Sequence, residues 1–267
     1  MKFFKMQAMG NDFIITTEDE IKEYKANISK YVKKLCDRKF GIGADGLIFA
    51  SKSVDADIKM NYYNADGSRA KMCGNGIRCL AKYMKKQFFF DKNEMDIETD
   101  DGIKKIFFDG DEVSVNMGEP QYILKEISGN EILNREIKIL DKKFIFSMVE
   151  VGVPHIVILV DKIPDNDFVE KYGSILENHN FFPNKTNVNF IEILDEHNFK
   201  IKTFERGVGI TLGCGTGCCA SMSVLDKLSI SNKYGNFISE GGELKIKIID
   251  DKIIMTGEAF ICFRGEI

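Results

Sequence analysis

Several features that mark particular classes of protein are missing from this sequence. The N-terminal stretch "MKFFKMQAMGNDF" has no sustained apolar run, because Asn11 and Asp12 interrupt it, so we predict no signal peptide. No other stretch approaches the length of a membrane helix, and we expect a cytoplasmic location. The net charge is −4 and the lysine pairs are scattered among acidic residues, so neither nucleic acid nor a membrane is an expected partner.

The cysteine content argues against a disulfide framework. Seven cysteines are an odd number, and the chain shows no secretion signal, so we expect reduced thiols. Free cysteine is among the residues most often buried in protein cores. We assign that packing role to Cys36, Cys79, Cys218 and Cys262.

Proline is scarce as well, with four residues against 23 glycines, which suits a strand-rich α+β protein with tight turns. Alternation of polar and apolar residues predicts strands, and helical periodicity is rarer. The clearest predicted strands are 58–63, 112–117, 155–160, 199–204 and 243–249, and the predicted helices are 28–38, 76–87, 167–178 and 216–228.

Two turn-rich segments suggest domain boundaries, "NMGEP" at 116–120 and "MTGEA" at 255–259. We therefore expect an N-terminal half at 1–117 and a C-terminal half at 118–256. The last strand, 257–267, is expected to rejoin the N-terminal half.

A repeated cysteine turn is the main functional signal. "CGNG" begins at Cys73 and "CGTG" begins at Cys214, about half the chain apart. Asn64 and Glu205 each lie nine residues before one of these cysteines, in "NADG" and "ERG". A helical stretch follows each turn. The pattern indicates that one structural motif, a cysteine turn followed by a helix, occurs in each of two related halves of the chain.

A glycine-rich turn that opens a helix leaves backbone N–H groups unpaired, and these form an anion site. The same environment favours a thiolate, so a cysteine there should have a lowered pKa. If the two helix starts face each other, a carboxylate can bind between them with one thiol on each side of the adjacent carbon. That arrangement suits racemisation, in which one cysteine removes a proton and the other delivers one, without a cofactor.

Other interpretations of these residues are weaker. "GCGTG" lacks the Gly-Lys-Ser/Thr ending of a P-loop, and neither turn matches the dinucleotide fingerprint. The cysteine spacings lack the paired two-residue gaps of structural zinc sites and the Cys-x-x-Cys of redox enzymes, so no metal is expected. His155 follows Pro154 at the start of an apolar strand, where a lone histidine is more often structural than catalytic.

Taken together, the motifs strongly resemble those of the diaminopimelate epimerase family, and they occur in order across nearly the whole chain. They are "MGNDF" (9–13), "GIGADG" (41–46), "YNADGS" (63–68), "MCGNGIRC" (72–79), "PH" (154–155), "TNVNF" (186–190), "ERGVG" (205–209) and "CGTGCCA" (214–220).

The resemblance implies an epimerase that is independent of pyridoxal phosphate, with two pseudo-symmetric α+β domains. Each would be a mostly antiparallel, barrel-like sheet around a central helix, with the active site in the cleft between them. It implies Cys73 and Cys214 as the acid/base pair. It further implies a closing motion around a small amino-acid substrate, and a homodimer.

The resemblance also assigns substrate-binding and tuning roles. Asn11, Gly74, Asn75, Gly215 and Thr216 would hold the reacting end of the amino acid. The distant end of the substrate would be bound by Asn64, Asn187, Glu205 and Arg206. The acidity of the two thiols would be adjusted by His155 and Glu205.

Three positions depart from the family pattern. Val153 replaces the asparagine of Gly-Asn-Pro-His, Ile210 replaces the glutamate of "GAGET", and Arg69 replaces the glutamate of "GSE". A buried polar group of the substrate would lose a partner at Val153, at a cost of about 1–3 kcal/mol. Two substrates therefore stay open: LL-/meso-diaminopimelate, or another amino acid with a less charged side chain, such as histidine.

Two further classes are alternatives. A phenazine-pathway-type isomerase would share the fold but lacks the paired cysteines. A non-catalytic amino-acid-binding module would bind the substrate without exchanging its α-hydrogen.

Overall fold

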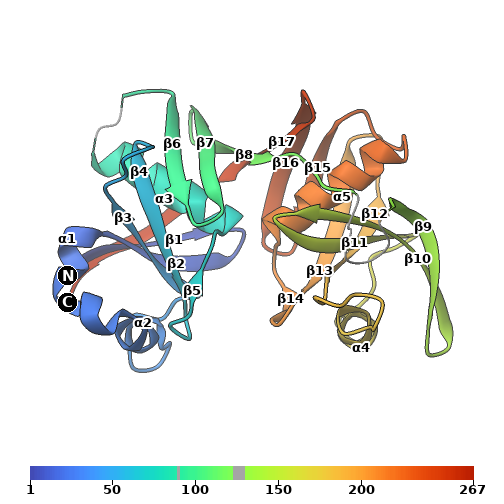
Figure 1. Cartoon of the computed structure of the whole chain (residues 1–267), viewed down its shortest axis with the longest axis horizontal. Helices are drawn as coiled ribbons and strands as arrows, with labels where there is room; N and C mark the ends of the chain where they lie inside the picture. Colours follow the sequence, from blue (N-terminus) through green and yellow to red (C-terminus); the bar gives the residue numbers. More distant parts are fainter. Residues whose placement is uncertain (89–90, 123–129) are drawn as a thin grey trace. The chain divides into compact units, whose positions relative to one another are not determined.

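The computed structural model describes residues 1–88, 91–122 and 130–267 (Figure 1). Contacts divide the chain into two units: an N-terminal unit of residues 1–116 and 256–267, and a C-terminal unit of residues 117–255. Both units have few helices and many strands in mixed sheets, so the fold class is α+β, as predicted.

The N-terminal unit contains most of the first half of the chain. Its strands are β1 (Lys2–Ala8), β2 (Asn11–Thr17), β3 (Gly46–Ser51), β4 (Ile58–Asn64), β5 (Arg69–Ala70), β6 (Glu94–Thr99), β7 (Gly102–Asp109), β8 (Glu112–Gly118, which runs past the division) and β18 (Phe260–Glu266). Its helices are α1 (Glu18–Ile21), a 3-10 helix (Lys22–Asn27), α2 (Ile28–Cys36) and α3 (Gly74–Gln87).

The C-terminal unit repeats this composition. Its strands are β9 (Ile132–Ile139), β10 (Lys142–Val151), β11 (Val153–Val160), β12 (Asn187–Ile193), β13 (Asn198–Glu205), β14 (Gly209–Thr211), β15 (Tyr234–Ser239), β16 (Gly242–Ile249) and β17 (Lys252–Glu258, which also crosses the division). Its helices are α4 (Asn166–Glu177) and α5 (Gly215–Lys227).

The two units pair their strands in the same order. In the N-terminal unit β1–β2 is antiparallel, β2–β3 parallel, β3–β4 antiparallel, β4–β6 parallel and β6–β7 antiparallel. In the C-terminal unit β10–β11, β11–β12, β12–β13, β13–β15 and β15–β16 repeat that series of directions. The units therefore share one topology, in which α3 and α5 occupy equivalent places.

The order of the elements places one helix at the centre of each unit. Every residue of α3 from Gly74 to Tyr83 is buried, and α3 contacts β1, β2 and β3. Helix α5 is buried to a similar degree and contacts β10, β11, β12 and β16. A helix that is covered on nearly all sides can keep its first turn in one fixed position.

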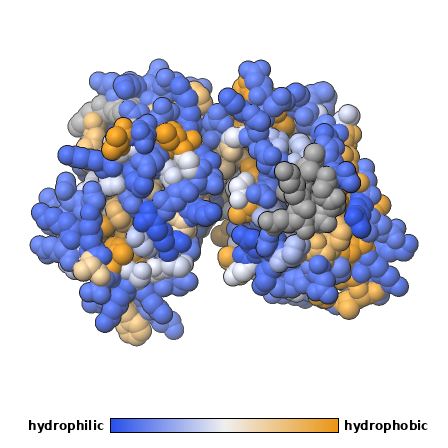
Figure 2. Space-filling model, in the orientation of Figure 1, coloured by the Kyte–Doolittle hydropathy of each residue, from blue (hydrophilic) through white to orange (hydrophobic). Residues whose placement is uncertain are grey.

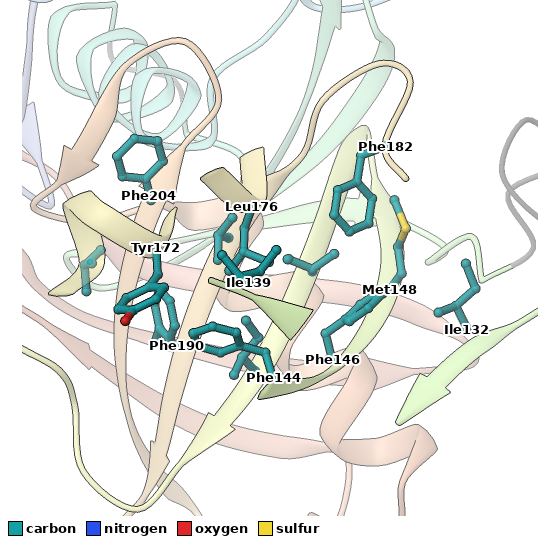
Figure 3. Close-up of a cluster of buried hydrophobic side chains, with 14 residues drawn as sticks. Ile132, Ile139, Phe144, Phe146, Met148, Tyr172, Leu176, Phe182, Phe190 and Phe204 are labelled. Carbon is teal, nitrogen blue, oxygen red and sulfur yellow. The ribbon is translucent and has the colours of Figure 1, made fainter. Parts of the chain in front are cut away.

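In each unit an apolar cluster also joins the sheet to α2 or α4. Figure 3 shows the C-terminal core, which includes Phe144, Phe146 and Phe190 of the sheet together with Tyr172 and Leu176 of α4. In the N-terminal unit the equivalent core joins Val32 and Leu35 of α2 to Ile14 and Leu47 of the sheet. Polar side chains cover most of the face seen in Figure 2.

The predicted strands and helices are all present, with small shifts at their ends. Helices α3 and α5 begin directly after Cys73 and Cys214, because each cysteine caps its helix. Of the four cysteines assigned to the core, Cys36, Cys79 and Cys218 are buried. The assignment of Cys262 is wrong: it is exposed on β18, a strand whose residues are largely exposed. In the described part of the chain, no helix is long and apolar enough to cross a membrane.

Candidate active site

Cys73 occupies the N-cap of α3. Its backbone is extended, with φ −140° and ψ 124°, and its sulfur accepts the backbone N–H of Gly76 at 3.5 Å. An N-cap side chain satisfies one of the helix-start donors in this way. The same donors and the helix dipole favour negative charge beside Cys73.

Asn11 of β2 lies against this sulfur. The distance from Cys73 Sγ to Asn11 Oδ1 is 3.6 Å, and the Asn11 Nδ2 group donates to Asp45 Oδ2 at 2.6 Å. The Asp45 carboxylate also accepts the backbone N–H of Asp12 and one guanidinium nitrogen of Arg38. The structure therefore joins Asn11 both to the catalytic candidate and to a charged network that the sequence analysis did not single out.

Asp12 lies between two cations in that network. Arg38 donates to both of its carboxylate oxygens, at 3.1 and 2.7 Å, and the Lys5 ammonium is 2.7 Å from Oδ2. Burial would raise the pKa of Asp12, but the hydrogen bonds from Arg38 and Lys5 outweigh it and hold that pKa well below its usual range. Asp12 is thus ionised at any physiological pH.

Gly74 and Asn75 form the buried first turn of α3, and Arg78 holds both. The fully buried Arg78 guanidinium donates to the Gly74 carbonyl at 3.0 Å and to Asn75 Oδ1 at 2.9 Å. The Asn75 amide oxygen therefore accepts a hydrogen bond from a buried cation.

Asn64 ends β4 beside the same network. Its Nδ2 group donates to the Ser68 hydroxyl at 3.0 Å, within the turn at 64–68. The next residue, Ala65, donates its backbone N–H to the carbonyl of Asp45 at 2.9 Å. Asp45 therefore connects the segments that carry Asn11 and Asn64.

Cys214 occupies the equivalent N-cap of α5. Its sulfur accepts the backbone N–H of Gly217 at 3.3 Å and lies 3.4 Å from the Thr216 hydroxyl. Burial, and next the charge of Glu205, raise the pKa of Cys214 well above its usual range, and these outweigh the contacts from Thr216 and Gly217. The lowered pKa expected from the helix start alone is therefore wrong for Cys214.

Glu205 is the carboxylate next to Cys214. It ends β13, and its Oε1 accepts the Thr211 hydroxyl at 2.7 Å. Burial raises the pKa of Glu205, while hydrogen bonds from Thr211 and Cys214 oppose that rise. When two acidic groups lie close together in a buried site, each raises the pKa of the other.

His155 of β11 is fully buried and belongs to a separate network of hydrogen bonds. Its Nδ1 lies 3.2 Å from the Nδ2 group of Asn189, which also donates to the Ile156 carbonyl, while Thr203 donates to Asn189 Oδ1. Since an amide N–H can only donate, His155 Nδ1 accepts and its proton is on Nε2. Burial, and next the charge of Arg206, lower the pKa of His155 to about 3, so the ring is neutral near pH 7.

Asn187 and Arg206 lie at the same end of the sheet, where β11 and β12 pair His155 with Asn187. Asn187 donates to the Pro154 carbonyl at 3.0 Å and accepts the backbone N–H of Arg206 at 2.9 Å. The Arg206 guanidinium donates to the Asn184 carbonyl at 2.9 Å. Asn187 thus ties together the strand ends that carry the other candidates.

Each unit therefore presents a thiol at the first turn of its central helix, with polar side chains around it. The structure groups Asn11, Gly74 and Asn75 near Cys73, and the segment of Asn64 is joined to Asp45 through the Ala65 backbone. It groups Gly215, Thr216 and Glu205 near Cys214, with Asn187, Arg206 and His155 at neighbouring strand ends. Among the described residues, no group of three or more His, Cys, Asp or Glu side chains is arranged to hold a metal ion.

Comparison with known proteins gives the family. The family model described as "Diaminopimelate epimerase" matches residues 3–123 and 147–261. The chain belongs to the diaminopimelate epimerase family. It is 42% identical to the diaminopimelate epimerase of Carboxydothermus hydrogenoformans, with 100% of this chain and 99% of the relative covered. It is 40% identical to that of Clostridium perfringens, with 98% of each covered.

The fold is also that of more distant solved structures. A Bacillus anthracis phenazine biosynthesis protein of the PhzF family superposes with a TM-score of 0.74 at 17% identity, over 100% of this chain and 98% of the other. At that identity the likeness shows the fold alone. As a member of the diaminopimelate epimerase family, the protein is an isomerase of the racemase and epimerase type.

The structure accounts for two of the three departures from the family pattern. Arg69 forms a two-point ion pair with Asp100, at 2.5 and 3.0 Å, and Ile210 packs against the C-terminal core. Val153 is partly buried at the start of β11 and faces Val151 across the strand pair.

Sequence reasoning missed the residues that support the candidates. Asp12 and Asp45 lie inside two of the quoted motifs, "MGNDF" and "GIGADG", and Asn189 lies inside "TNVNF". Their positions inside those motifs could have identified them as candidates. Arg38 and Lys5 lie outside every motif, and only the fold brings them to Asp12.

Proposed function

We propose that this enzyme inverts the α-carbon of an amino acid by proton transfer between two cysteines, Cys73 and Cys214. The proposal is supported by their equivalent places, since each caps the central helix of one of two units with the same topology. It requires both sulfurs to reach one α-carbon, from opposite faces. A reaction in both directions then needs only an exchange of acid and base roles.

The surroundings of the two thiols suggest which one ionises first. The pKa of Cys214 is raised by burial and by Glu205, so this thiol keeps its proton at neutral pH. Cys214 is then the proton donor, and Cys73 is the thiol that gives up its proton to become the base. In the reverse direction the roles are exchanged.

The substrate carboxylate would bind at the two helix starts. Backbone N–H groups at Gly74, Gly215 and Thr216, together with the Asn75 amide, offer donors there, and Asn11 would hold the same end of the substrate. These fixed dipoles would also stabilise the charge that develops when the α-proton leaves. Such a weak carbon acid could then ionise without a cofactor.

For the substrate, diaminopimelate is favoured. Relatives named diaminopimelate epimerase cover almost the whole chain, and Asn64, Asn187, Glu205 and Arg206 would read the distant end. Arg69 and Ile210 have partners within their own units and do not call for a different ligand. Val153 is the observation that favours a less charged amino acid, such as histidine, because valine offers no hydrogen bond.

The test is solvent deuterium uptake at Cα, measured by mass spectrometry or NMR, for diaminopimelate and a panel of L-amino acids. We expect exchange with diaminopimelate, and we expect Cys73→Ser and Cys214→Ser each to reduce racemisation by at least about 1000-fold with the fold retained. Fast exchange of histidine alone would select the second substrate.

Binding of an amino acid without exchange of its α-hydrogen would identify a non-catalytic module. Full activity of either the Cys73→Ser or the Cys214→Ser variant would contradict the cysteine pair.

A cytoplasmic location and a homodimer stay predictions from the sequence and the family resemblance.

A further inference from the structure

Four charged residues in the N-terminal unit have no role in the proposed chemistry, yet they are arranged around one of its side chains. They are Asp45, Asp12, Arg38 and Lys5, called here the Asp45 network. Asp45 precedes β3, Asp12 is in β2, Arg38 follows α2 and Lys5 is in β1. Ion pairs link all four, and Asp45 joins them to Nδ2 of Asn11, the end of the amide that does not face Cys73.

The contacts of Asn11 decide how its amide is turned. An ionised carboxylate can only accept hydrogen bonds, so the end of the amide that faces Asp45 must be Nδ2. That contact is 2.6 Å long, and the other end, Oδ1, is therefore the end that faces Cys73 Sγ at 3.6 Å. In the opposite orientation of the amide, Asn11 Oδ1 would lie against a carboxylate oxygen of Asp45, and neither atom could donate.

The Asp45 carboxylate is itself fixed. Its Oδ2 also accepts the Asp12 backbone N–H at 3.1 Å, and its Oδ1 accepts from Arg38 at 2.8 Å. Its backbone N–H donates to the Asp12 carbonyl at 2.9 Å. Lys5, only 7% exposed, lies 2.7 Å from the Asp12 carboxylate, so two cations balance two anions. These contacts hold the carboxylate and its segment in one orientation at a partly exposed place.

We propose that Asp45 is a positioning residue: it fixes the Asn11 side chain with Oδ1 toward Cys73 and thereby sets the pH at which that thiol ionises. An oxygen acceptor stabilises the protonated thiol, whereas an N–H donor would stabilise the thiolate. The inference rests on the proposed function, in which Cys73 gives up its proton. Of the described residues, Arg78 and Cys79 of α3 also lie near this turn, and every variant below leaves them unchanged.

The test is the pH dependence of the rate at which iodoacetamide modifies Cys73, read from the Cys73 peptide by mass spectrometry in the full chain without substrate. Asp45→Ala frees the Asn11 amide to turn its N–H toward the sulfur. The midpoint for Cys73 should then fall by about 0.5–1 pH unit, the size expected for one hydrogen bond.

A double-mutant cycle with Asn11→Ala separates positioning from simple charge. If Asp45 acts through Asn11, adding Asp45→Ala to Asn11→Ala should not shift the midpoint further. A shift that persists undiminished in the Asn11→Ala background would mean that the Asp45 charge acts directly, and it would overturn the proposal. An unchanged midpoint in Asp45→Ala would also overturn it.

The matched control is Asp100→Ala. Asp100 is likewise an aspartate paired with an arginine in this unit, through Arg69, but within the described residues no hydrogen bond or ion pair joins it to Asn11. It should leave the Cys73 midpoint unchanged. If Asp45→Ala fails to fold, Asp45→Asn replaces it: its single oxygen must serve Asn11 or Arg38, and a smaller shift in the same direction is expected.

The readout does not depend on turnover, which separates the two ideas. Absence of α-hydrogen exchange in the unmodified enzyme would contradict the proposed function while the cycle still reports on Asp45. Normal exchange with a failed cycle would contradict the positioning role alone.

Discussion

At the scale of single residues, the two cysteines have the same backbone role and different surroundings. Cys73 faces the neutral amide of Asn11, whereas Cys214 faces the carboxylate of Glu205. Helix geometry is common to both, so the difference in their chemistry comes from side chains that belong to neighbouring strands. In the proposed mechanism, this difference would set the order in which the two thiols lose their protons.

Glu205→Gln tests the electrostatic part of this difference. The glutamine keeps an acceptor for Cys214 and Thr211 but removes the negative charge, so the pKa of Cys214 should fall. The measurement is the pH dependence of iodoacetamide modification of the Cys214 peptide. Glu192→Gln is the control, because Glu192 accepts the Ile163 backbone N–H elsewhere in the same unit. An equal shift in both variants would contradict a specific effect of Glu205.

At the scale of elements, the first turns of α3 and α5 are matched in sequence but packed differently. Gly76 and Gly217 each donate to a capping sulfur three residues earlier. A Cβ on Gly76 would lie 2.5 Å from Ile48 Cδ1, the end of an aliphatic side chain. A Cβ on Gly217 would lie 2.4 Å from Asn189 Oδ1, which Thr203 holds in place.

Gly217→Ala should therefore destabilise the protein more than Gly76→Ala. Alanine gains about 1 kcal/mol in helix propensity at either position. Overpacking against the fixed Asn189 amide should outweigh this gain, for a net loss of about 1–2 kcal/mol. Thermal unfolding followed by far-ultraviolet circular dichroism gives the comparison. A larger loss in Gly76→Ala would show that the Ile48 side chain cannot move aside.

At the scale of the whole molecule, the two units should differ in their response to acid, because His155 belongs to the C-terminal unit alone. The folded pKa of about 3 is below the value of about 6.5 for an unfolded histidine. Between these values the unfolded chain binds a proton that the folded chain does not, so stability rises with pH in that window. The contribution is complete above pH 6.5 and is lost as the pH falls toward 3.

We expect about 2 kcal/mol of local stability to be lost between pH 8 and pH 5 through this one side chain. Native-state hydrogen exchange, corrected for intrinsic rates, should show the loss in β11 and β12 peptides. His155→Gln should flatten that dependence, because glutamine does not titrate. β6 and β7 peptides serve as the internal reference, and an equal acid dependence in them would contradict a local origin at His155.

The sequence by itself determined the fold class, the main strands and helices, and the two cysteine turns, because periodicity and glycine turns act over a few neighbouring residues. It also contained the motifs of the family. It led to an error for Cys262, since the exposure of a strand face depends on what packs against it. It also led to an error for the pKa of Cys214, since a helix start says nothing of burial.

Only the tertiary structure decided which distant side chains surround each thiol. Asn11, Asp45 and Arg38 come from separate segments, and strand pairing brings them to one place beside Cys73. Glu205 reaches Cys214, and Asn189 reaches His155, in the same way. Hydrogen bonds and burial act over a few ångströms in space, and the distance along the chain does not set them.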